Sequence, residues 1–199
     1  MKLLIGVSGK LGSGKDYIVN NLIIPILQER NIRHLQFNFA DQLKINVMTK
    51  NNIEYDDVYE RKTEFSRQLL QKEGTEIGRN INKNVWIDYF ENWVKVLGNR
   101  GIQSFVISDV RFKNEFEYIK HNCGLLIKVV SKQRNQDRLH QESVGNKQTF
   151  DKIKNHISEC DLDDIPDEKY DMVIYNEDIM NIVEEKEKVS TLLNKYTNI

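Results

Sequence analysis

A glycine-rich loop near the start of the sequence constrains the fold more than any other feature. Residues 9–15 spell GKLGSGK, which fits the pattern GxxxxGK between the apolar run Leu3–Ser8 and a helix beginning at Lys15. In such a loop, backbone N–H groups point inward at phosphate oxygens, and the following helix presents its positive N-terminal end to the same anion. A glycine-rich turn that only connects a strand to a helix is the alternative, but motif and context together favour a phosphate-binding loop.

Apolar segments alternate with amphipathic ones along the rest of the chain. Pro25 should kink or break the first helix, residues 41–83 are polar with helical propensity, and residues 131–160 resemble an exposed, mobile segment. Strands that alternate with helices predict an α/β fold with a parallel sheet, which binds ligands at the carboxyl ends of its strands. We expect strands at 3–8, 34–39, 102–109, 125–130 and 172–175, and helices from 15, 85–97, 112–120 and after 176 into the 190s.

The glycine-rich loop supplies most of the residues that we expect to bind ATP. Lys15 would add a positive charge over the β- and γ-phosphates. Asp16 stands where such loops usually carry a Ser or Thr that binds Mg²⁺, and a carboxylate could hold the ion directly or through water. The expected ATP-binding residues here are Gly9, Lys10, Gly12, Ser13, Gly14, Lys15 and Asp16.

Two charged residues follow the third expected strand. Asp109 would hold Mg²⁺ or its waters, as acids do in Walker B motifs, and Arg111 would stabilise charge on the transferring phosphoryl group. A structural ion pair at a strand end is the alternative. Asp16 and Asp109 are therefore the two candidate metal ligands.

Arginines form a third signal. Arg67 and Arg79 lie in the polar stretch, and Arg134 and Arg138 lie in the expected mobile segment. Phosphoryl transfer depends on alignment and on cations around the phosphate oxygens, a task that suits guanidinium groups. A solubilising surface role is the alternative for each arginine alone.

Charge and composition argue against several other classes. The formal net charge of -1 does not suit a dedicated nucleic-acid binder, and no apolar run is long enough to span a bilayer. Cys123 and Cys160 lie far apart without a CxxC motif. We therefore expect no direct nucleic-acid binding, no membrane association and a cytoplasmic location, while a homodimer is left open.

Five stretches resemble the deoxynucleoside monophosphate kinases of tailed phages and some large DNA viruses. They are GKLGSGKD, FNFADQLK, LLQKEGTEIGR, ISDVRFKNEFEYI and HISECDLDDIPDEKYDMVIYN, in the expected order over nearly the whole chain. The phosphate loop alone occurs in many families. The family patterns GTExGR and DVRFxNE, which residues 74–79 and 109–115 match, are together much more specific. The resemblance implies ATP-dependent phosphorylation of dNMPs with Mg²⁺, in the host cytoplasm if the protein is viral.

The resemblance also implies an adenylate-kinase-like organisation and roles for particular residues. We expect a single three-layer P-loop domain over 1–199, with core segments 1–50, 86–130 and 161–199, an acceptor-binding insertion at 51–85 and a lid at 131–160. Lys15, Arg111 and the lid residues Arg134 and Arg138 would be catalytic, and Asn176 would lie near the adenine. The expected acceptor-site residues are Asp41, Lys44, Arg67, Glu76, Arg79 and Trp86.

Two other functions and three smaller features remain open at this point. A kinase for another phosphorylated acceptor, such as phosphomevalonate, also uses an SGKD loop, and a nucleotide-dependent switch would hydrolyse ATP without an acceptor. The acidic run 161–168 is a solvated loop or a cation site, and core packing is expected for Trp93. The family that the sequence resembles has an HxSE segment, which residues 156–159 match better than residues 140–143 do.

Overall fold

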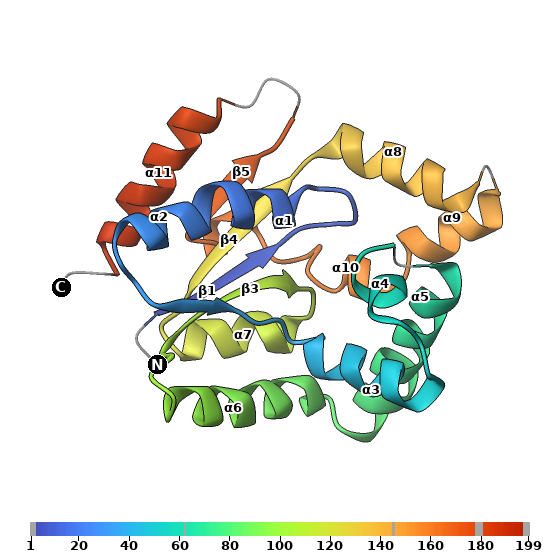
Figure 1. Ribbon diagram of the computed structural model, residues 1–199. Coiled ribbons are helices and arrows are strands. Elements are labelled where there is room, and N and C mark those ends of the chain that lie inside the picture. Colours follow the sequence, from blue (N-terminus) through green and yellow to red (C-terminus); the bar gives the residue numbers. More distant parts are fainter. Residues whose placement is uncertain (1–2, 62, 145, 178–180, 197–199) are drawn as a thin grey trace. The chain divides into compact units, whose positions relative to one another are not determined.

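The computed structural model of the protein describes residues 3–61, 63–144, 146–177 and 181–196 (Figure 1). The chain divides into two compact units. Residues 1–36 and 102–199 form the first, which we call the sheet unit, and residues 37–101 form the second, which we call the helical unit. Within the described residues, no helix is long and apolar enough to cross a membrane.

The sheet unit is built on five parallel strands in the order β2-β3-β1-β4-β5. The central strand β1 pairs with β3 on one side, where Ile5 lies opposite Val106, and with β4 on the other, where Ile5 lies opposite Leu125. The expected α/β fold with a five-stranded parallel sheet is therefore confirmed. The strands are β1 (Leu3–Ser8), β2 (His34–Gln36), β3 (Ser104–Val110), β4 (Leu125–Val130) and β5 (Met172–Tyr175).

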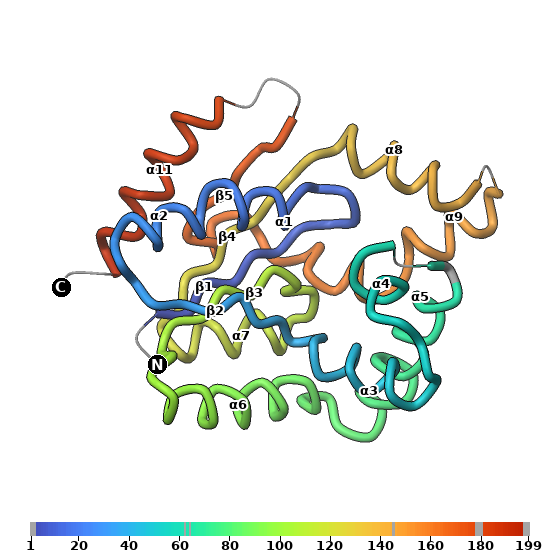
Figure 2. Tube along the Cα trace, in the orientation of Figure 1, coloured from blue at the N-terminus to red at the C-terminus, as the bar shows by residue number. Residues whose placement is uncertain are grey.

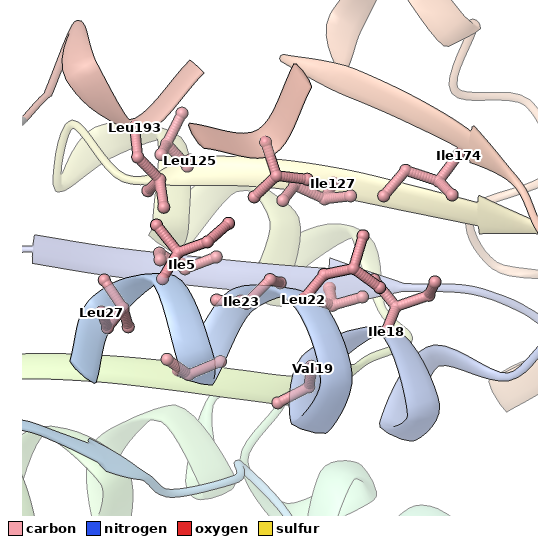
Figure 3. Close-up of a cluster of buried hydrophobic side chains, with 14 of the residues drawn as sticks. Ile5, Ile18, Val19, Leu22, Ile23, Leu27, Leu125, Ile127, Ile174 and Leu193 are labelled. Atoms are coloured by element: carbon pink, nitrogen blue, oxygen red, sulfur yellow. The ribbon is translucent and has the colours of Figure 1, made fainter. Parts of the chain in front are cut away.

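Helices cover both faces of this sheet, which gives the sheet unit three layers (Figure 1). On one face lie α1 (Lys15–Ile18), the π-helical turn η1 (Val19–Ile23), α2 (Ile24–Glu29) and α11 (Ile182–Asn194), and on the other lies α7 (Lys113–His121). Figure 3 shows the apolar side chains of the first face, where Leu22 and Ile23 meet Ile5 and Ile127. Full burial of each such side chain stabilises the fold by about 1.5–3 kcal/mol. This core anchors the start of α1, and with it the end of the phosphate loop.

The first helix continues past Pro25, where the sequence predicts a kink or a break. Proline has no N–H to donate, and its ring crowds the preceding turn. The helix takes the wider π-helical form in η1, just before Pro25. Pro25 then lies in the first turn of α2, where the absence of its backbone N–H costs little free energy. Residues 15–29 are therefore helical throughout, with a change of hydrogen-bond pattern just before Pro25.

The segment from Lys132 to Cys160, expected to be exposed and mobile, is largely helical. It forms α8 (Lys132–Ser143) and α9 (Lys147–Lys154), which Figure 2 shows one after the other, and then α10 (Ile157–Cys160). The short 3₁₀ turn η3 (Asp167–Lys169) comes before β5. Periodicity failed to predict these helices because few of their side chains are buried: Leu139 and Ser143 are the buried residues of α8, and α9 has none. A contact between the rings of His140 and Phe150, 4.9 Å apart, joins α8 to α9.

The helical unit packs around aromatic residues. Phe39 and Phe90 are buried, with ring centroids 5.1 Å apart. β2 ends at Gln36 and not at Phe39 as expected, and Phe39 belongs to the helical unit. Trp93 was expected in the core but is 36% exposed, and its indole N–H donates to Gln42. The elements are α3 (Asp41–Asn51), α4 (Tyr55–Tyr59), α5 (Glu64–Gln71), the π-helix η2 (Lys72–Arg79) and α6 (Val85–Gly98).

Candidate active site

The loop between β1 and α1 has the backbone geometry of a phosphate cradle. Gly12 and Gly14 have φ angles of 74° and 82°, in the left-handed region that glycine adopts without strain. The N–H of Ser13 donates to the carbonyl oxygen of Lys10 at 3.1 Å, which closes the turn. Lys15 is buried and Asp16 is exposed in the first helical turn. The loop can therefore present backbone N–H groups and the charge of Lys15 to an anion.

Asn176, the residue directly after β5, supports this loop. Its side chain is 1% exposed, and its Nδ2 donates to the carbonyl oxygen of Ser13 at 2.9 Å. A β-carbon placed on Gly14 would lie 2.1 Å from the same nitrogen. The structure thus gives Asn176 a role in shaping the phosphate loop, while its expected contact with adenine stays a prediction.

The first helix of the expected lid lies against the loop. A β-carbon on Gly12 would lie 2.8 Å from the carbonyl oxygen of Arg134 and 2.7 Å from the β-carbon of Arg138. The side chain of Asn135 donates to the carbonyl oxygen of Leu11 at 2.6 Å. The structure therefore brings the backbone that carries the two lid arginines beside the phosphate loop.

The side chain of Arg138 pairs with Glu142, one turn further along α8, at 2.6 Å. Arg134 is exposed and makes interactions of its own. In this conformation Glu142 holds the Arg138 guanidinium, so a contact from Arg138 to a phosphate would require that pair to open.

Arg111 lies directly after β3, in a turn fixed by Glu115. One oxygen of Glu115 accepts the backbone N–H groups of Arg111 and Phe112, at 2.8 and 3.1 Å. The Arg111 guanidinium forms an ion pair with Glu159. Burial by itself lowers the pKa of Arg111, but the negative charges of Glu159 and Asp109 outweigh burial and raise that pKa. Arg111 is therefore a permanent cation at the carboxyl edge of the sheet.

The acidic run 161–168 is largely exposed, as expected of a solvated loop, and its carboxylates also form ion pairs. Its carboxylates bind groups of the sheet unit: Asp163 pairs with Lys10 at 2.8 Å, and Asp167 pairs with Lys128 at 2.7 Å. The backbone N–H of Lys113, at the start of α7, donates to Asp161 at 2.7 Å. The run thus lies across the carboxyl ends of the strands and neutralises lysines there.

A cavity of about 390 Å³ opens beside the phosphate loop. This volume falls in the range of small-molecule sites. Its walls come from the loop, the ends of β3 and β4, the first turn of α8 and residues 158–170, and they carry both cations and apolar groups. Representative lining residues are Gly9, Ser13, Arg111, Lys132, Glu159 and Tyr170.

The helical unit brings two of the expected acceptor residues together. Asp41 accepts hydrogen bonds from Lys44 and from the Tyr59 hydroxyl, each at 3.3 Å, and the Lys44 ammonium lies 4.3 Å from the centre of the Tyr59 ring. Tyr55 stacks on Tyr59, with ring centroids 4.5 Å apart. No local sequence pattern marks Tyr59 as part of this cluster, because it lies 18 residues from Asp41 along the chain.

The other expected acceptor residues lie further along this unit. Arg67 is in α5 and partly buried, and Glu76 and Arg79 are in η2, which continues directly from α5. Arg79 donates to the carbonyl oxygen of Lys83 at 3.2 Å. Trp86 is buried, and its indole N–H donates to the carbonyl oxygen of Gly74 at 2.9 Å, so the ring helps to hold η2. Its contact with an acceptor base stays a prediction.

The donor atoms of the sheet unit suit Mg²⁺ only together with a nucleotide. Among the residues that the structure describes, no group of three or more His, Cys, Asp or Glu side chains is arranged to hold a metal ion. Mg²⁺ commonly takes one or two carboxylates and completes its octahedron with phosphate oxygens and water. The carboxylates of Asp16, beside the loop, and Asp109, near the end of β3, fit such a partial set.

Comparison with known proteins points to one family. Residues 18–187, most of the chain, match the family model described as Deoxynucleotide monophosphate kinase. A protein of Acanthamoeba polyphaga mimivirus, named "Putative deoxynucleotide monophosphate kinase", is 29% identical in an alignment of 147 residues that covers 64% of this chain and 73% of the viral protein.

The similarity of the backbone to those of solved structures is weak. Dephospho-CoA kinase from Campylobacter jejuni aligns with a TM-score of 0.49 at 17% identity, over 98% of both chains. Shikimate kinase from Acinetobacter baumannii, in complex with shikimate, aligns with a TM-score of 0.46 at 11% identity, over 99% of this chain and 96% of that one.

Proposed function

Because this chain belongs to the deoxynucleotide monophosphate kinase family, we propose that its sheet unit binds ATP and that residues of its helical unit bind the acceptor dNMP. The observation that carries this proposal is the geometry of the phosphate loop. Residues 9–15 lie outside the part of the chain that matches the family model, so the loop supports a nucleotide-dependent kinase independently of that match.

The reaction joins an oxygen of the acceptor phosphate to the γ-phosphorus of ATP and breaks the bond between that phosphorus and the β–γ bridging oxygen, which leaves with ADP. Charge builds up on the γ-phosphoryl oxygens and on the leaving group, and fixed cations stabilise it. Lys15 and Arg111 supply two such cations. Both belong to the sheet unit, and the raised pKa of Arg111 supports its permanent charge.

The lid arginines, Arg134 and Arg138, complete this set in our proposal. Their helix α8 runs beside Gly12, and this proximity supports a role for the two arginines at a phosphate on the loop. The ordered helices α8 to α10 support a lid that excludes water from the transferring group, which would otherwise be lost to hydrolysis.

Mg²⁺ would screen the negative charge between the two nucleotides and polarise the γ-phosphate. Asp16 and Asp109 are its proposed protein ligands. Asp16 brings a negative charge close to the β-phosphate, which makes the ion more necessary here than in loops that carry a hydroxyl at this position.

The acceptor side rests on Asp41, Lys44, Arg67, Glu76, Arg79 and Trp86. Lys44 is already oriented by Asp41 and by the Tyr59 ring, so binding a phosphate there costs less conformational entropy. Arg67 and Arg79 would hold the acceptor phosphate with forked N–H groups, and Glu76 and Trp86 would contact the nucleoside.

An acceptor panel tests the proposal. ATP consumption is measured with each common dNMP and NMP, with phosphomevalonate, and without acceptor. We expect consumption to depend on a dNMP. Turnover with phosphomevalonate alone would indicate another kinase class, and equal turnover without acceptor would indicate a nucleotide-dependent switch.

A further inference from the structure

The carboxylate of Glu159 joins two separate parts of the phosphate site. Its Oε2 accepts the backbone N–H of Leu11, within the loop, at 2.7 Å, and its Oε1 accepts the Arg111 guanidinium. The Glu159 side chain is 9% exposed and that of Arg111 is 29% exposed. Both oxygens are therefore engaged, in a place where water screens the ion pair only partly.

The short helix α10 fixes the direction of this carboxylate. His156 caps the helix: the N–H of Ser158 donates to its Nδ1 at 3.3 Å, and the N–H of Glu159 donates to its carbonyl oxygen at 2.8 Å. The residues of the HxSE match at 156–159 therefore have structural roles. The histidine and serine form the turn, and the glutamate reaches the phosphate loop.

Both backbone polar groups of Leu11 are hydrogen-bonded to side chains. Glu159 binds its N–H, while Asn135 of α8 binds its carbonyl oxygen at 2.6 Å. Arg111 is likewise held at its backbone by Glu115 and at its guanidinium by Glu159. The loop and the arginine are thereby tied to the same carboxylate.

We propose that Glu159 is a positioning residue for phosphoryl transfer. It holds the Arg111 guanidinium beside the phosphate loop, in the orientation in which Arg111 contacts the γ-phosphoryl group. This inference rests on the proposed function of Arg111. Misplacing a reacting or stabilising group by about 1 Å can cost about 10²-fold in rate, so the orientation of Arg111 is worth a dedicated residue.

A carboxylate suits this task better than its closest substitutes. It offers an acceptor oxygen to each of two donors. The Gln amide offers one acceptor and one N–H₂ group, which would face a donor, and Ala offers neither. Asp keeps both oxygens but is shorter by one methylene group.

A rival role for the same contact is that Glu159 occupies the place of a phosphate oxygen on the loop and competes with ATP. The two roles predict opposite effects on binding. A competing carboxylate weakens ATP binding, so its removal tightens it, whereas a positioning residue acts mainly on turnover.

Steady-state kinetics on Glu159→Gln, Glu159→Ala and Glu159→Asp separate these roles. We expect Gln and Ala to lower kcat by about 10–100-fold with KM for ATP changed by less than about threefold, and Asp to retain more turnover than Gln. Asp164→Asn is the matched control, because Asp164 lies nearby, is exposed and pairs with exposed Lys113. We expect that variant to have normal turnover.

A double-mutant cycle with Arg111→Ala gives the decisive readout. If Glu159 acts through Arg111, adding Glu159→Gln to Arg111→Ala lowers kcat little further, and the two losses are far from additive. Additive losses, near-normal kcat in Glu159→Gln, or tighter ATP binding would each overturn the inference. Normal turnover in Arg111→Ala alone would overturn the proposed role of Arg111, and this inference with it, so the two failures are distinct.

Discussion

Asn176 and Ser13 are joined by a buried hydrogen bond, 2.9 Å from the Nδ2 of Asn176 to the carbonyl oxygen of Ser13. Ser13 stands one residue before Gly14, at the point where the phosphate loop turns into α1. The end of β5 therefore holds the loop in the shape that binds an anion. A residue 163 positions away along the chain thus supports the loop.

Asn176→Ala should lower the free energy of unfolding by about 1–3 kcal/mol, because the carbonyl oxygen of Ser13 then loses its buried donor. It should also raise KM for ATP. Asn122→Ala is the matched control, since Asn122 makes the same type of bond, to Tyr118 at 2.9 Å, on the exposed surface. Urea unfolding and ATP titration measure both effects. Equal, small effects in the two variants would contradict the supporting role.

Lys15→Met should lower turnover by about 10²-fold or more while the protein stays folded. Met matches the apolar stem of the buried lysine, but it lacks the charge that we assign to the β- and γ-phosphates. Lys186→Met, at a half-exposed lysine of α11 that pairs with Glu29, serves as the control for loss of one positive charge. Near-normal turnover in Lys15→Met would remove this residue from the catalytic set.

Asp16→Ala should raise the Mg²⁺ concentration needed for half-maximal activity, and Asp16→Ser, which restores the common hydroxyl, should recover part of that loss. A purely structural Asp16 would instead stabilise the helix end by about 0.3–1 kcal/mol. In that case Asp16→Ala lowers thermal stability slightly and leaves the Mg²⁺ dependence unchanged. Mg²⁺ titrations at saturating ATP and dNMP distinguish the two roles.

Arg67→Ala and Arg79→Ala should weaken dNMP binding, or turnover with dNMP, and change ATP affinity little. Both residues belong to the helical unit, to which we assign the acceptor. Arg61→Ala is the control from the same unit, because Arg61 is largely exposed and pairs with Asp57. Separate equilibrium titrations of each nucleotide test this. Loss of ATP binding with intact dNMP binding would reverse our division of the two sites.

The sequence predicts the sheet well because its strands are short apolar runs whose burial leaves a clear signal. β1 and β4 begin and end at the expected residues. The helices α8 and α9 escape prediction because their stability comes from caps and a few contacts, not from an apolar stripe. Trp86 and Trp93 share one amphipathic helix, yet only Trp86 is buried, since tertiary neighbours decide which turn is covered.

The candidate site likewise has one part that the sequence predicts and another part that it does not. The phosphate loop follows from local pattern and is present as expected, with Gly12 and Gly14 in the conformation that the motif requires. The contact between Glu159 and Leu11 spans 148 residues, and no local pattern carries that information. The ion pairs of the acidic run escaped notice for the same reason, because charge alone does not show which lysine lies opposite.

Transfer of a labelled phosphoryl group tests the central claim most directly. The protein is incubated with Mg²⁺, [γ-³²P]ATP and a single dNMP, and the products are separated, with Lys15→Met as the inactive control. We predict that the label appears in the β-phosphate of the dNDP, in an amount equal to the ADP formed. Label found only in inorganic phosphate, at a rate that does not depend on dNMP, would contradict the account.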